Sequence, residues 1–141
     1  MAMTMHVDVV SAESSIYSGT VEAVFAPAQM GEVGIMPRHS PFLAQLKPGQ
    51  VRIIKRGGEE DFFYVSGGLI EVLPHTVTVL ADTVLRAQDV DEAAAIESRE
   101  RAAQAVRDRT GEMEWAEAQI ELARAIAQLQ VIQHLRKLAK R

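Results

Sequence analysis

Glycine and proline are concentrated in the front part of this chain, and their distribution breaks near Asp89. All five prolines and eight of the nine glycines precede this residue, whereas the residues after it include twelve alanines, one glycine and no proline. Glycine and proline mark turns, while alanine favours helix. We therefore expect an N-terminal antiparallel β-sandwich over residues 1–86 and a C-terminal antiparallel two-helix hairpin, the tail, over residues 87–141.

In the front part, short runs of β-branched, aromatic or alternating residues recur between turn signals. Runs this short, about ten residues apart, favour a β-sandwich or a barrel. Gly57 and Gly58 lie between two runs and predict a hairpin turn. We expect the strands to be complete by Asp82. The runs are Val7–Val9, Val21–Val24, Gln50–Lys55, Asp61–Val65, Leu69–Leu73 and Thr76–Leu80.

The stretch from Gly31 to Leu43 differs from its surroundings because it holds two glycines and two prolines. Pro37 and Pro41 stiffen the backbone and cannot donate to a β-ladder. This pattern predicts an edge strand followed by a structured loop. The alternative is a preformed docking loop, since binding residues concentrate on loops that a rigid scaffold holds.

Signals for two helices follow. Asp89 or Asp91 can cap the first helix, and Glu92 stands at capping-box spacing from Asp89. Thr110-Gly111 indicates the end of that helix. The second helix is expected over about Glu114–Leu138, and the short connection favours an antiparallel hairpin.

The hairpin has a seam made largely of small residues. Small side chains bury little area, so the gain from packing barely offsets the ordering entropy of about 1 kcal/mol or more per residue. We therefore expect the tail to pack on the sandwich or on a partner, and to be a candidate two-state element. The seam comprises Trp115, Ala118, Leu122, Ala125, Leu129 and Ile132, facing Ile96, Ala103 and Val106.

Charge is sorted along the second helix. Four glutamates crowd its start, and no acidic residue follows Leu122. This order complements the helix dipole, and it also suits contact between the basic end and an acidic partner surface. The two interpretations are compatible. The cations concerned are Arg124, Arg136, Lys137, Lys140 and Arg141.

Several classes of protein are disfavoured by composition. The net charge of −4 argues against general nucleic-acid binding. The chain has no cysteine, which excludes disulfides and thiolate metal sites, and it has no apolar run of the ~20 residues that a membrane span needs. The N-terminus resembles neither a secretory signal nor a transit peptide. The four histidines are scattered, so we expect no metal site, no catalytic residue and no independent enzyme.

Three stretches together resemble a known family. They are Gly31–Pro41, then Ser66–Val72 with Val77–Asp82, and finally Ala123–Leu129. In this order, joined to a sandwich and a helical hairpin, they are similar to the epsilon subunit of the bacterial F-type rotary ATP synthase. The resemblance covers essentially the whole chain.

The resemblance implies a non-catalytic rotor subunit of the central stalk of a proton-translocating ATP synthase, coupling rotation of the c ring to the catalytic head. The sandwich would bind the gamma subunit and rest on the ring of c subunits. Glu32, Met36, Arg38 and His39 would form the contact loop, with Glu32 facing the c ring and His39 close to gamma. The protein would lie at the cytoplasmic face of the bacterial inner membrane, attached only through the complex.

The resemblance also implies a regulatory tail. The hairpin would fold down on the sandwich or extend along gamma, and the extended form would inhibit ATP hydrolysis. Its basic end, with Arg124, Arg136, Lys137 and Lys140, would then approach an acidic segment of the alpha/beta catalytic subunits.

One departure concerns ATP as a regulatory ligand. Some family members bind it through an Ile/Leu-Asp-x-x-Arg-Ala motif, and the matching stretch here is Val90–Ala95. Asp91 is present, but Ala94 replaces the arginine, which removes a charge-assisted partner worth about 1.5–3 kcal/mol. Arg101 could compensate in part. We expect weak or absent ATP binding and no cofactor.

Two alternatives stay open at this point. The chain could be a free-standing β-sandwich adaptor with a helical oligomerisation arm, which would self-associate through Leu122, Leu129 and Ile132. It could also be a small-molecule-binding or hydrolytic β domain that uses His39 and Glu32.

Overall fold

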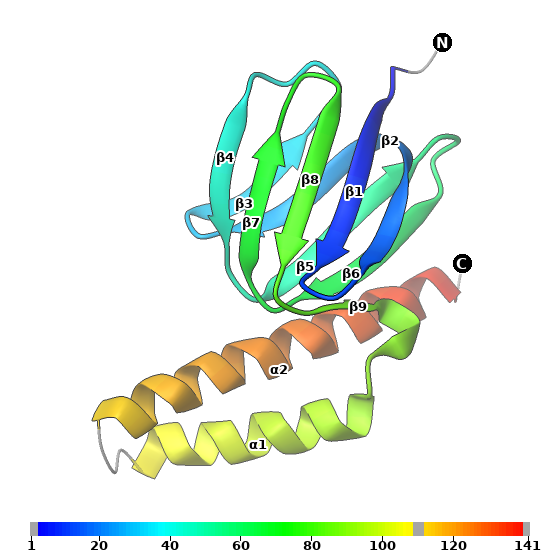
Figure 1. Ribbon diagram of the computed structural model, residues 1–141. Coiled ribbons are helices and arrows are strands. Elements are labelled where there is room, and N and C mark those ends of the chain that lie inside the picture. The colour runs from blue at the N-terminus through cyan, green and yellow to red at the C-terminus, as the bar shows by residue number, and fades with distance from the viewer. Residues whose placement is uncertain (1–2, 109–111, 140–141) are drawn as a thin grey trace.

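The computed structural model describes residues 3–108 and 112–139, and in this part of the chain nine strands precede a short 3-10 turn and two helices (Figure 1). Thr110, Gly111, Lys140 and Arg141 lie outside the described residues, as does the side chain of Trp115. The elements are β1 (Met5–Ser11), β2 (Ser15–Ala28), β3 (Gly31–Ile35), β4 (Phe42–Leu46), β5 (Gly49–Lys55), β6 (Glu60–Val65), β7 (Gly68–Val72), β8 (Thr76–Ala81), β9 (Val84–Arg86), η1 (Ala87–Asp89), α1 (Glu92–Asp108) and α2 (Glu112–Ala139).

The strands form one hydrogen-bonded sheet that folds over into two layers, with the helical hairpin beneath one end (Figure 1). The strand order is β1-β8-β7-β4-β2-β5-β6-β9, and β3 pairs with β2 alone. The long strand β2 joins the layers, because its first half pairs with β1 and its second half with β5 and β3. The predicted sandwich and two-helix tail are confirmed, with one parallel pair, β1–β8, in a sheet that is otherwise antiparallel.

The strands do not end by Asp82, so that prediction was wrong. Residues 84–86 form β9, which pairs with β6 through Phe63↔Arg86 and Val65↔Val84. Three residues are too few to show an alternating pattern. They become a strand because β6 offers an unpaired edge beside them.

The main core lies between the two layers and consists mostly of valine and isoleucine at alternate strand positions. Alternation places successive side chains on opposite faces, so each strand contributes every second residue. The buried residues include Val7, Val9, Val21, Val24, Val51, Ile53, Phe63, Val65, Ile70, Val72, Val77 and Val79.

Two predicted loop features are confirmed. Gly57 and Gly58 form the β5–β6 hairpin turn with φ of 96° and 89°, in the left-handed region that glycine tolerates. The Gly31–Leu43 stretch is an edge strand, β3, followed by a loop that leads into β4. Within that loop Arg38 has φ of 66°, and its backbone N–H donates to the Pro74 carbonyl at 2.9 Å.

Asp91, and not Asp89, caps α1. The Ala94 N–H donates to the Asp91 carboxylate at 3.1 Å, whereas Asp89 lies in η1. Glu92 does not complete a capping box with Asp89. It forms an ion pair with Arg136 at the far end of α2 instead.

The two helices pack on each other, but the predicted seam is confirmed only in part. Leu122 is only half-buried, and Ile132 belongs to the apolar core that α2 shares with β6. On α2, Ala118, Ala125, Leu129 and Ile132 are buried. On α1 the most buried residues are Ala95 and Ala102, each 2% exposed and seven positions apart, whereas the predicted Ile96, Ala103 and Val106 are half-buried.

The tail packs on the sandwich, as predicted for a hairpin with so small a seam. The second half of α2 lies against the outer face of β6, where Phe62 and Tyr64 contact Val131 and Ile132 in a second apolar core. Since Phe63 faces the main core, both faces of β6 are buried. This explains why three aromatic residues follow one another at positions 62–64.

Candidate partner-binding surfaces

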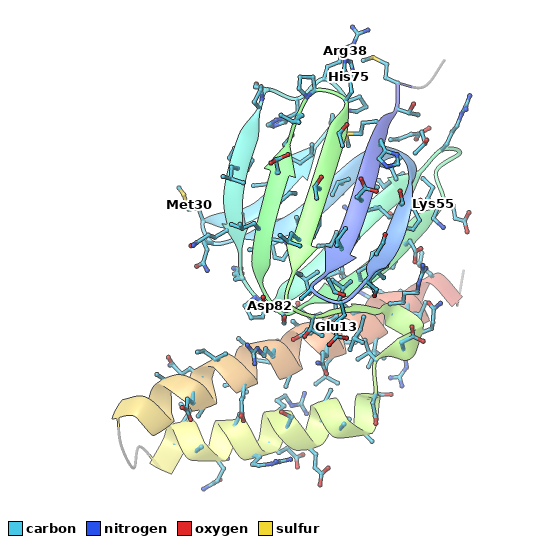
Figure 2. All side chains as sticks on the ribbon, in the orientation of Figure 1. Glu13, Met30, Arg38, Lys55, His75 and Asp82 are labelled. Carbon is cyan, nitrogen blue, oxygen red and sulfur yellow. The ribbon has the colours of Figure 1, made fainter. Side chains whose placement is uncertain are left out.

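The loop after β3 forms a rigid end of the sandwich. Arg38 and His75 lie there together, away from the tail (Figure 2). The His39 ring Nδ1 is 2.7 Å from the Ser40 carbonyl oxygen, and the ring lies edge-on to Phe42 at 6.1 Å. Met36 is half-exposed beside them. These side chains are held by local contacts and face solvent, as a preformed docking loop requires.

Glu32 does not join the rest of this predicted set. It is a residue of β3, and three further residues of that strand, about 10 Å of extended chain, separate it from the loop. Its side chain lines a groove between sandwich and tail together with Gln50, His134 and Lys137. Glu32 and His39 therefore build no common site, which removes the basis for a hydrolytic domain that uses both.

The predicted basic end of the tail is only partly one cluster. Arg136 pairs with Glu92, and its neighbour Lys137 lines the groove beside Glu32. Arg124 is twelve residues earlier on the helix, about 18 Å away along its axis. In the docked position, cations of α2 therefore lie near the protein's own acidic groups only at the C-terminal end of the helix.

Polar contacts fix the docked tail in register. The His134 ring Nδ1 is 2.5 Å from the Gln50 side-chain oxygen, and the ring packs on Phe62 with 5.5 Å between centroids. Burial raises the pKa of the Tyr64 phenol above its ordinary value of 10.0, and the Gln128 side chain and the Arg124 charge oppose that shift. The neutral phenol is therefore the form that suits the docked tail.

Tyr64 makes tail docking sensitive to alkaline pH. Because docking raises the pKa of Tyr64, this residue stabilises the docked state at pH values below its undocked pKa. That stabilisation is lost as the pH rises through its docked pKa. We expect the melting temperature to be steady up to about pH 10 and to fall above it. Thermal melts from pH 7 to 11 test this. Tyr64→Phe should flatten the part of the decline that is due to this residue, and an unchanged slope would contradict the assignment.

The two residues considered for ATP binding, Asp91 and Arg101, lie apart from each other along the chain, and Asp91 already has a structural role. The Asp91 carboxylate accepts the Ala94 N–H as a helix cap. Arg101 is exposed on α1, ten residues further along. Among the described residues, no three potential metal ligands come together.

An exposed apolar face on the layer formed by β1, β8, β7 and β4 was not predicted from the sequence. Leu43, Leu69 and Leu80 point outward from β4, β7 and β8 and are 65%, 41% and 48% exposed. Leu69 is opposite Leu80 on β8, whereas Leu43 is opposite Glu71, two residues further along β7. We call these three leucines the outer sheet face. The available signal was Glu71, a charged residue that shares a strand phase with Leu69 and Leu73 and therefore marks that phase as outward.

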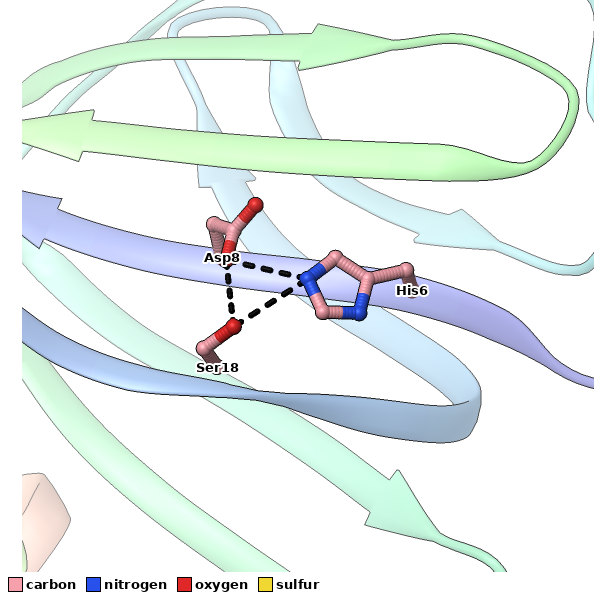
Figure 3. Close-up of polar contacts among 3 residues, drawn as sticks. All are labelled: His6, Asp8 and Ser18. Atoms are coloured by element: carbon pink, nitrogen blue, oxygen red, sulfur yellow. Dashed lines mark hydrogen bonds and ion pairs between the residues drawn. The ribbon is translucent and has the colours of Figure 1, made fainter.

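A polar cluster borders that face (Figure 3). The Ser18 hydroxyl donates to the Asp8 carboxylate at 2.7 Å, and His6 Nε2 lies 3.1 Å from both the Asp8 and Ser18 oxygens. The hydrogen bonds from Ser18 and His6 lower the pKa of Asp8 below its ordinary value of 3.8, against a smaller effect of burial. A nucleophilic serine must give its proton to a histidine that a separate carboxylate orients. Here the serine proton goes to the carboxylate, so the cluster is a surface network without an activated nucleophile.

Within the part of the chain that the structure describes, neither helix combines the length and the hydropathy of a membrane span.

Comparison with known proteins gives a consistent result for both parts of the chain. Residues 4–87 match the ATP synthase delta/epsilon chain beta-sandwich domain, and residues 88–133 match the long alpha-helix domain of the same chains. The chain is 65% identical over 137 residues to the ATP synthase epsilon chain of Nitrosococcus oceani, covering 97% of this chain and 98% of that one. It is 57% identical over 137 residues to ATP synthase epsilon chain 1 of Methylococcus capsulatus, again covering 97% and 98%.

Solved structures share the fold at much lower identity. A chain in the mitochondrial ATP synthase of Euglena gracilis, solved with its F1 and c-ring parts, superposes with a TM-score of 0.81 at 20% identity, covering 88% of this chain and 78% of that one. A chain from the central stalk and c ring of the Tetrahymena thermophila enzyme gives 0.61 at 15% identity, covering 92% and 97%.

Proposed function

The chain belongs to the ATP synthase delta/epsilon chain family, and from this premise we propose that it is the epsilon-type subunit of the central stalk. It is a non-catalytic rotor component that couples rotation of the c ring to the catalytic head. The observation that carries this function is the agreement of both parts: a sandwich with exposed docking surfaces and a helical hairpin held on it by a small apolar core.

We propose that the gamma subunit covers the outer sheet face and part of the end loop. Leu69 and Leu80 form an exposed apolar pair across β7 and β8, with the exposed Leu43 nearby on β4, and exposed apolar patches mark protein contact surfaces. His39 and Phe42 continue this surface at the loop. A flat, rigid, apolar face suits a partner that must rotate with the subunit without slipping.

The c ring is proposed to contact the same end of the sandwich through Met36 and Arg38. Glu32 lies apart from them, in the groove between sandwich and tail, so its contact with the ring is proposed as a separate one. Exposed polar and charged side chains on a stiff loop suit the polar loops of a membrane ring. The protein would then lie peripherally at the cytoplasmic face of the bacterial inner membrane, held there by the complex.

The tail is proposed to regulate ATP hydrolysis. Arg136 is paired with Glu92 between the two helices of the tail, and Lys137 lines the groove between sandwich and tail beside Glu32. Undocking would remove Lys137 from that groove, and separation of α1 from α2 would free Arg136. Both cations, with Arg124 and Lys140, would then be available to an acidic segment of the alpha/beta subunits. ATP binding is proposed to be weak or absent, because Ala94 supplies no guanidinium and Asp91 already caps α1.

Rebinding to a depleted complex tests the stalk assignment. Rotor complexes of gamma and the c ring, stripped of this subunit, are mixed with the purified chain and separated by size-exclusion chromatography. We expect co-elution at one copy per gamma subunit. A chain that elutes apart from the complex as a self-associated oligomer would support the adaptor alternative instead.

A further inference from the structure

The apolar surface of the sandwich does not stop at the end of the sheet. A cleft of about 500 Å³ lies between the β4–β5 and β6–β7 turns of the sandwich and the first half of α2. Ile120 of α2 stands in its wall and is 50% exposed. The other walls include Leu46, Pro48, Gly67, Ala116 and Ala123.

This cleft lies next to the outer sheet face. A shallow hollow on that face is lined by Gln45, Gly68, Leu69 and Leu80. Leu46 and Gly67, the chain neighbours of Gln45 and Gly68, line the cleft. The two hollows therefore lie next to each other at the β6–β7 turn, and Figure 2 shows Asp82, which also lines the hollow on the sheet, at this end of the sandwich.

The chemistry of the cleft restricts what can occupy it. None of the nine described residues that line it is charged, in a chain with 24% charged residues. The lining offers small apolar side chains, two glutamines and a serine. An uncharged, mainly apolar protein segment fits such a lining, whereas a charged one would lose hydration without gaining a partner.

We propose that the docking surface for gamma is composite: gamma covers the outer sheet face and continues into the cleft, where it contacts Ile120 of the docked tail. This inference rests on the proposed function. Because the cleft exists only while α2 lies on the sandwich, gamma binding and tail docking then favour each other, and by linkage each strengthens the other by the same factor. Gamma thus acts on the position of the tail through a direct contact.

Two isoleucines of α2 give a matched test. Ile120→Gln removes the apolar wall of the cleft and keeps a good helix former. Ile126→Gln makes the same change at a residue that is 42% exposed but does not line the cleft. Leu69→Gln tests the outer sheet face alone. Binding of each full-length variant to purified gamma is measured by calorimetry, and hydrogen exchange of residues 116–123 is measured with and without gamma.

The expected pattern separates the inference from the proposed function. Ile120→Gln should weaken gamma binding about tenfold, as loss of a buried aliphatic contact does, while Ile126→Gln binds like the wild type. If gamma occupies the cleft, it should slow hydrogen exchange at residues 116–123 of the wild-type chain. If Leu69→Gln weakens binding but Ile120→Gln does not, the composite surface is wrong and the sheet face stands. If neither variant weakens binding, the proposed docking face fails as well.

Discussion

Replacing Gly68 with alanine should destabilise the sandwich more than any other single methyl group added at a glycine. Gly68 opens β7 with φ of 144°, and a Cβ there would lie 2.1 Å from the Leu80 carbonyl oxygen and 2.7 Å from the Ala81 Cα. Both atoms belong to the backbone of β8, so the strand pair itself must separate. We expect a loss of about 4 kcal/mol or more, the range of severe core defects, seen as unfolding at room temperature or a large drop in the midpoint of urea denaturation.

Two other glycines with positive φ, Gly67 and Gly31, distinguish the effect of the clash from the effect of the backbone conformation. Gly67 has φ of 120°, but its added Cβ would meet only the Leu46 carbonyl oxygen at 3.4 Å, and Gly31, with φ of 133°, would meet nothing within 4 Å. Alanine at either position should cost about 1–2 kcal/mol from strain alone. Equal losses at positions 31, 67 and 68 would contradict the close approach of β7 and β8.

Val131→Asp should release the tail and leave the main core intact. Val131 is fully buried between α2 and the outer face of β6, against Phe62 and Tyr64. An unpaired carboxylate there costs several kcal/mol, about 3 or more, which exceeds what a seam of small residues can restore. We expect fast hydrogen exchange and early proteolysis throughout α1 and α2, while the strands stay protected.

Ile126→Asp is the control for helix propensity and charge. Ile126 is on the same helix but lies outside the contact with β6, so the tail should remain docked. If Val131→Asp keeps the protection of the wild type, the second core does not hold the tail. If the strands of Val131→Asp lose protection as well, the tail is part of one cooperative unit with the sandwich.

Much of the fold follows from local sequence signals, and the exceptions share a cause. The strands of the main core and the Gly57-Gly58 turn follow from alternation and turn chemistry, which are local properties. β9 does not, because it depends on a free edge on β6. The choice between the two predicted caps, Asp89 and Asp91, depends on the position of η1, which holds Asp89. Such outcomes depend on what lies beside a residue in space.

The candidate surfaces show the same division. The stiff loop with Met36, Arg38 and His39 could be predicted, since prolines and glycines fix a backbone. The position of Glu32 could not, because the groove it lines is completed by His134 of α2, about a hundred residues later in the chain. The outer sheet face could have been predicted in part, because the charged Glu71 shares a strand phase with Leu69 and so places that leucine on the outside.

The central claim is that this chain is a stalk subunit whose tail controls ATP hydrolysis by leaving the sandwich. The natural chain has no cysteine, so Gln50→Cys and His134→Cys, whose native side chains touch, can be joined by a short thiol-reactive crosslinker to hold the tail down. The most direct measurement is ATP hydrolysis by catalytic particles stripped of this subunit, with the double variant added back before and after crosslinking. We predict inhibition by the open form and none by the crosslinked form. Equal inhibition by both forms would contradict the claim and assign regulation to the sandwich.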